Sequence, residues 1–211
     1  MQIVLRSTHL LLAVALVAGL SSVARAQGEI PREGDGTRTV RAANDSVKDL
    51  LQQKVEPGSP AEKKLAAQVT RSVRDFLDID TLGKRALRDH WEKISAGQRR
   101  DFLENLRGLV EANYIKALRA NVDYEVKYLG ETPQGEQLLV KTEVIAKRNG
   151  RPRSITIDYV LTREGKAWRA FDVVTDEVGL VDNYRAQFNK IIAKDGMGGL
   201  LDRMRKKRSK M

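Results

Sequence analysis

The spacing of apolar residues changes once along this chain, from a helical period to a strand period, and this change constrains the fold most. From Val40 to Leu118 the apolar side chains recur every three or four residues, which is typical of amphipathic helices. From Val122 they alternate with polar residues over four successive segments, which is typical of strands with one buried face. Helices that precede a run of strands predict an α+β fold.

The four alternating segments predict an antiparallel meander. They cover residues 122–128, 138–146, 155–161 and 167–175. Pro133-Gln134-Gly135, Asn149-Gly150 and Glu164-Gly165 lie between them, and pairs such as Asn-Gly favour tight hairpin turns. We therefore expect a curved, four-stranded antiparallel sheet with one face to cover.

Amphipathic helices are available to cover that face. Apolar stripes predict about five to seven helices, over residues 37–51, 60–77, 78–91, 95–119, 180–192 and 197–204. Ser59, Pro60 and Glu62 form a helix start signal, because Ser caps a helix and Pro suits its first position. We expect the helices to lean on the rim of the curved sheet and to leave an apolar cleft between the layers.

The N-terminal residues have the three parts of a secretory signal peptide. A short segment with Arg6 precedes the apolar run Leu10 to Leu20, and Ala24-Arg25-Ala26 fits a small-residue cleavage site. An uncleaved anchor is the alternative, but the run is shorter than the roughly 20 residues that span a bilayer. We predict a signal peptide over 1–26, a flexible mature N-terminus over 27–36, a single domain over 37–204 and a basic tail over 205–211.

The charge balance favours an anionic partner. The chain has a net charge of +10 at pH 7 and no cysteine, so an exported form must fold on core packing alone. Export argues against nucleic acid and favours anionic membrane surfaces or lipids, although the excess charge can also serve only to keep the protein in solution. The basic run Arg203 to Lys210 is either a solvated tail or a contact with such a surface.

Signals of catalysis are weak in this sequence. His90 is the one histidine after the signal segment and no cysteine accompanies it, which argues against zinc. No Gly-rich phosphate loop or nucleophile elbow is present. We expect Asp158 to face solvent and Asp172 to pair with an arginine, the alternative being a buried aspartate that acts as a general base. We therefore predict no enzyme activity, no catalytic residues, no metal and no cofactor.

Two stretches of the chain resemble a known protein family. They run from Phe76 to Leu118 and from Ala167 to Met204, and the second contains W-R-x-F-D-V followed by N-Y-R-x-Q-F-x-x-I-I. Together with the strands between them they resemble the MlaC (toluene-tolerance) family of periplasmic phospholipid carriers, over about Thr37 to Met204. Asp176 to Leu180 and the basic tail depart from the family pattern.

The resemblance implies an NTF2-like sheet wrapped by helices, with an apolar pocket for the acyl chains of a phospholipid ligand. It also implies a periplasmic protein that makes transient contact with membranes. The implied partners are an outer-membrane lipoprotein–porin complex and an inner-membrane ABC lipid transporter complex, in a system that maintains outer-membrane lipid asymmetry. We expect a monomer. The alternatives are an isomerase or dehydratase on the same scaffold, an envelope adaptor without a pocket, and a hopanoid-linked member of the family with another lipid.

The ligand is predicted to lie between the sheet and the helices, against apolar side chains. The chosen strand positions share the inward parity of their strands. Val173 is the exception, because regular alternation would place Trp168 and Ala170 on that face instead. The predicted lipid-binding residues are Leu106, Val110, Tyr114, Val140, Val144, Ile157, Tyr159, Val173, Tyr184, Phe188 and Ile192.

Overall fold

The computed structural model describes residues 33–56, 58–120, 124–148 and 151–210. The chain divides into two units, Met1–Arg32 and Glu33–Met211, and every described residue belongs to the second. The predicted signal peptide, most of the predicted flexible N-terminus and the Asn149-Gly150 turn lie outside the described residues. No described helix is both long enough and apolar enough to cross a membrane.

Helices begin where side chains satisfy the first backbone N–H groups. Ser59 accepts a hydrogen bond from the N–H of Glu62 at 3.1 Å, and Ser95 and Gln98 exchange such bonds reciprocally. The helices in the described residues are α1 (Asp35–Leu51), α2 (Pro60–Phe76), α3 (Ile79–Ala86), the 3₁₀ helix η1 (Trp91–Lys93), α4 (Ala96–Ala120) and α5 (Leu180–Arg208).

The strands form one antiparallel sheet in chain order, as the alternation predicts. They are β1 (Tyr124–Gln134), β2 (Gln137–Arg148), β3 (Arg151–Glu164), β4 (Ala167–Thr175) and the two-residue β5 (Val178–Gly179). The α+β class is confirmed, and β5 is an addition to the predicted four strands. β1 continues through Pro133 to Gln134, so the turn lies at Gly135 and Glu136. A proline is tolerated there because β1 is an edge strand.

A β-bulge in β4 places Val173 on the same face of the sheet as Ala170, although regular alternation would place them on opposite faces. The register against β3 shifts at Phe171, which no β3 residue opposes. Ala170 pairs with Leu161 before the shift, and Val173 pairs with Tyr159 after it. Because the extra residue resets the alternation, Ala170 and Val173 lie on the same face of the sheet.

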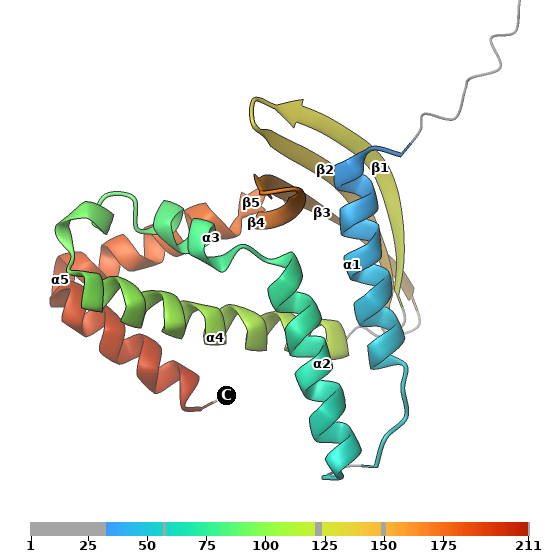
Figure 1. Cartoon of the computed structure of the whole chain (residues 1–211), viewed down its shortest axis with the longest axis horizontal. Helices are drawn as coiled ribbons and strands as arrows, with labels where there is room; N and C mark the ends of the chain where they lie inside the picture. Colours follow the sequence, from blue (N-terminus) through green and yellow to red (C-terminus); the bar gives the residue numbers. More distant parts are fainter. Residues whose placement is uncertain (1–32, 57, 121–123, 149–150, 211) are drawn as a thin grey trace, which may run out of the picture. The chain divides into compact units, whose positions relative to one another are not determined.

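The helices pack against one another and against the sheet to bury a single apolar core. In Figure 1, α1 crosses the sheet at β1 and β2, and α2, α3 and α5 contact β4. Gly83 allows α3 to approach α4 closely, since a Cβ there would lie 2.7 Å from Cδ2 of Leu103. Fully buried side chains include Val40, Val69, Val73, Leu87, Phe102, Leu106, Val140, Leu161 and Leu200.

Helix α5 bends at Gly196, and its second half returns along α4 (Figure 1). Gly196 has φ 70° and ψ −179°, a conformation that essentially only glycine adopts. Arg205 then pairs with Asp101 at 2.8 Å and Arg208 with Glu104 at 3.0 Å, both on α4. The basic residues up to Arg208 therefore belong to a helix that packs on α4.

Candidate functional site

An apolar cavity of about 520 Å³ lies between the helices and the face of the sheet that they cover. Lys207 is the only charged group among the described residues that line it. The lining residues are Asn44, Leu77, Val110, Asn113, Tyr124, Val126, Val144, Ala146, Ile155, Ile157, Tyr159, Val173, Thr175, Leu180, Asn183, Tyr184, Gln187 and Lys207.

The sheet contributes a continuous apolar wall to this cavity. Val144 lies between Val126 of β1 and Ile155 of β3 in the register, and Tyr159 of β3 pairs with Val173 of β4. Directly opposed residues point to the same face of a sheet. Strand alternation therefore places these apolar side chains of four strands on one face of the sheet, with their polar neighbours on the opposite face.

Helices α4 and α5 form the facing wall. Their lining residues follow helical spacing, which places them on one side of each helix. They are Val110 and Asn113 of α4, and Leu180, Asn183, Tyr184 and Gln187 of α5. The Tyr184 ring stacks on Phe188 at 5.3 Å between centroids. Burial raises the pKa of Tyr184, which outweighs the lowering by its hydrogen bond with Asn113, so the hydroxyl is neutral near pH 7.

Polar groups occupy the rim of the cavity. Asn113, Asn183, Gln187 and Lys207 are exposed as well as lining it, which places one end of the cavity at the surface. The hydroxyl of Tyr124 is buried and has no hydrogen-bond partner among the described residues. An amphiphile would thus meet apolar side chains inside and hydrogen-bonding groups at the rim.

The structure brings six of the eleven predicted lipid-binding residues around this cavity. They are Val110, Val144, Ile157, Tyr159, Val173 and Tyr184. Leu106, Val140 and Phe188 do not line it and are buried in the core. Ile192 is partly buried against that core, and the side chain of Tyr114 lies outside the described residues. The role of all eleven in lipid binding remains a prediction.

Several lining residues were missed by the sequence analysis. Val126 and Ile155 share the parity of Val144, so the alternation could have identified them. Leu77 follows α2 and forms a bridge to Ala170 of β4. No local pattern predicts that bridge, nor the return of Lys207 to the cavity after the bend in α5.

The aspartate and histidine side chains considered for catalysis have structural contacts. Oδ1 of Asp172 accepts hydrogen bonds from the N–H groups of Val173 at 2.9 Å and Val181 at 3.1 Å, rather than from an arginine. It therefore caps the start of α5 from a neighbouring strand. Nε2 of His90 is 2.9 Å from Oδ1 of Asn189. Among the described residues, no group of three or more His, Cys, Asp or Glu is placed to hold a metal ion.

We predict that Asp172 makes the protein less stable as the pH rises. Burial raises the pKa of this carboxyl, and its backbone hydrogen bonds only partly oppose that shift. The folded state then binds the proton more tightly than the unfolded state. The free energy of unfolding therefore falls as the pH rises from the ordinary pKa of an aspartate to its raised pKa in the folded protein.

Two variants test this effect. Asp172→Asn keeps an acceptor for the cap and should remove the fall in stability, whereas Asp172→Ala should lower the free energy of unfolding by about 0.5–2 kcal/mol through the lost cap. Denaturant unfolding at several acidic pH values measures both effects, and parallel pH profiles of wild type and Asp172→Asn would contradict the prediction.

Comparison with known proteins gives three findings. A sequence model of the family described as MlaC protein matches residues 41–206. The intermembrane phospholipid transport system binding protein MlaC of Haemophilus influenzae is 21% identical over 143 residues, which are 67% of this chain and 67% of that protein. A phospholipid-binding protein of Ralstonia solanacearum, solved in complex with a phospholipid, matches with a TM-score of 0.69 and 21% identity, over 84% of this chain and 98% of that chain. This last likeness shows a shared fold.

Proposed function

The chain belongs to the MlaC family, and on that premise we propose that it is a phospholipid carrier whose cavity holds acyl chains during transfer between membranes. The observation that carries the proposal is the apolar cavity between the sheet and helices α4 and α5. The names of the two similar proteins, which refer to phospholipid transport and phospholipid binding, support it.

The interior of the cavity suits hydrocarbon. Its volume of about 520 Å³ falls within the range of about 300–1,000 Å³ that is usual for ligand pockets. Each buried methylene contributes about 0.8 kcal/mol, so ten methylenes would contribute roughly 8 kcal/mol towards binding. Holding and releasing lipid requires no bond to be broken, so we propose a carrier rather than an enzyme.

We place the phospholipid headgroup at the exposed rim. Lys207 can attract a phosphate there, and the amides of Asn183 and Gln187 can donate hydrogen bonds to its oxygens. A headgroup that stays hydrated and makes few fixed contacts leaves easily, because few interactions with the protein have to be broken. This orientation reconciles firm holding of the acyl chains with delivery of the lipid.

Location and partners are proposed on two further grounds. The pattern of the first 26 residues is that of a secretory signal peptide, so we propose a periplasmic protein. The family resemblance supports exchange with an outer-membrane lipoprotein–porin complex and an inner-membrane ABC lipid transporter. Such exchange would maintain the lipid asymmetry of the outer membrane.

Native mass spectrometry of the purified protein tests this proposal. We expect a bound mass that extraction identifies as intact phospholipid, and transfer of that lipid from loaded protein to acceptor vesicles. Protein that carries no lipid, and takes up none from phosphatidylethanolamine vesicles, would contradict a carrier. Recovery of chemically altered lipid would instead favour the enzyme alternative.

A further inference from the structure

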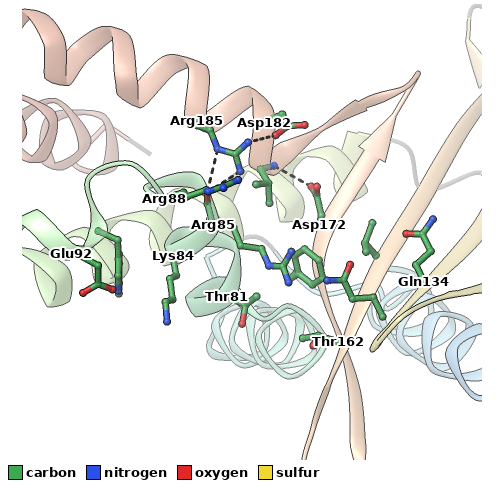
Figure 2. A pocket seen from close by; sticks show the side chains of 15 residues that line it. Thr81, Lys84, Arg85, Arg88, Glu92, Gln134, Thr162, Asp172, Asp182 and Arg185 are labelled. Carbon is green, nitrogen blue, oxygen red and sulfur yellow. Dashed lines mark hydrogen bonds and ion pairs between the residues drawn. The ribbon is translucent and has the colours of Figure 1, made fainter.

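A second hollow, of about 820 Å³, lies on the other side of the first turns of α5, and most of the side chains that line it are polar or charged (Figure 2). We call it the basic groove; its residues are Thr81, Lys84, Arg85, Arg88, Trp91, Glu92, Gln134, Gln137, Val160, Thr162, Phe171, Asp172, Val181, Asp182 and Arg185. Val160 and Thr162 have the opposite strand parity to Ile157 and Tyr159. The groove and the apolar cavity therefore lie on opposite faces of β3.

The carboxylates that line the basic groove are already engaged. Glu92 pairs with Arg99 at 3.1 Å, and Asp182 pairs with Arg185 at 2.6 Å. Asp172 caps α5 through its bonds to backbone N–H groups, one of which is drawn in Figure 2. None of these three carboxylates neutralises a cation of α3 or of the turn after it.

Three cations of the groove have no acidic partner. Lys84, Arg85 and Arg88 form no ion pair with any described residue, although all three line the hollow. A hollow concentrates the field of such charges more than a flat surface does. Uncompensated cations within one hollow favour an anion with several negative oxygens.

One of these cations is held in place. The guanidinium of Arg85 lies 4.1 Å from the centroid of the Phe171 ring, a cation–π contact that fixes its position. The carbonyl oxygen of Arg85 accepts hydrogen bonds from Nε and Nη2 of Arg185, which ties α3 to α5. A preorganised guanidinium loses little conformational freedom when it binds an oxyanion.

We propose that the basic groove is a second binding site, specific for a phosphate group and separate from the acyl cavity. Lys84, Arg85 and Arg88 supply the charge, and Thr81, Gln134 and Thr162 line the same hollow and add neutral hydrogen-bonding groups (Figure 2). Guanidinium and ammonium groups among hydroxyl and amide donors match the oxygens of phosphate. The phosphate comes either from a soluble phosphate compound or from the headgroup of a lipid in a membrane.

Titration with sodium pyrophosphate, at ionic strength held constant with sodium chloride, tests the site. We expect saturable changes in the amide NMR signals of residues 81–88, at pyrophosphate concentrations where chloride alone has no effect. The double variant Lys84→Gln/Arg88→Gln leaves the Arg85–Phe171 contact in place and should bind at least about tenfold more weakly, since it removes two charged hydrogen-bond donors. The control Lys63→Gln/Lys64→Gln removes the same charge from exposed positions of α2 and should bind within about twofold of wild type.

A second arm distinguishes the two sources of phosphate. If the groove takes lipid headgroups, sedimentation with phosphatidylglycerol vesicles should fall for the Lys84/Arg88 double variant and not for the control. If it takes soluble phosphate, vesicle binding should be equal for the two variants while pyrophosphate binding differs. The proposal is overturned if pyrophosphate causes no saturable change at residues 81–88, or if both double variants weaken its binding equally. Lipid content measured by native mass spectrometry should be unchanged in both variants, which separates this site from the acyl cavity.

Discussion

Val144→Asp and Ile157→Asp are each expected to yield a folded protein that no longer co-purifies with lipid. Both side chains line the apolar cavity from neighbouring strands, and both are only partly buried. An aspartate in the empty cavity can keep contact with water through the open rim, so the fold should tolerate it. Once an acyl chain fills the cavity, the same carboxylate would be buried without a partner, at a cost of several kcal/mol. That cost removes most of the binding free energy that the chain provides.

The matched control for this prediction is Thr156→Asp. Thr156 is the neighbour of Ile157 in β3, but it is exposed and points to the opposite face of the sheet. The substitution Thr156→Asp introduces the same charge one residue away from Ile157 and should leave the bound lipid unchanged. Native mass spectrometry reports the lipid content, and circular dichroism reports folding. Folded Val144→Asp and Ile157→Asp proteins with normal lipid content would place the acyl chains elsewhere.

The alternation of apolar residues predicted the sheet wall of the cavity well. A period of two assigns each strand residue to a face without knowledge of the rest of the fold, and Val144, Ile157 and Tyr159 line the cavity accordingly. The same rule could not place Val173 and Ala170 on one face together, because a bulge cannot be recognised from the alternation alone. The bulge at Phe171 places both residues on the covered face.

Features that depend on contacts between distant segments could not be predicted in this way. The β4–β5 turn uses Asp176 and Glu177 at φ 47° and 68°. Sequence rules assign such conformations to glycine, asparagine or aspartate, so Glu177 does not fit them. β5 therefore went unpredicted. The bend at Gly196 returns the basic segment to α4 and brings Lys207 to the cavity, whereas charge composition alone describes a solvated tail.

Helix periodicity separates the buried side of a helix from its exposed side, but it cannot distinguish core from cavity. On α4, Leu106 and Val110 lie four residues apart on the same side, and both were predicted to contact lipid. Val110 lines the cavity, whereas Leu106 is one turn away in the core. Leu106 is completely buried beside Gly83 of α3, since a Cβ on that glycine would lie 3.0 Å from its Cδ2 atom.

Leu106→Ala is therefore expected to lower the free energy of unfolding by about 2–5 kcal/mol, because it leaves a void where α3 and α4 meet. The molecules that remain folded should retain their lipid, since the acyl cavity is unchanged. Val110→Ala, the matched truncation on the same side of the helix, should reduce lipid retention because it removes a wall contact. Denaturant unfolding of delipidated protein measures the first effect, and lipid content per folded molecule measures the second. A Leu106→Ala protein that loses less than about 1 kcal/mol of stability but also loses its lipid would show that Leu106 contacts the ligand after all, and would extend the acyl cavity one turn along α4.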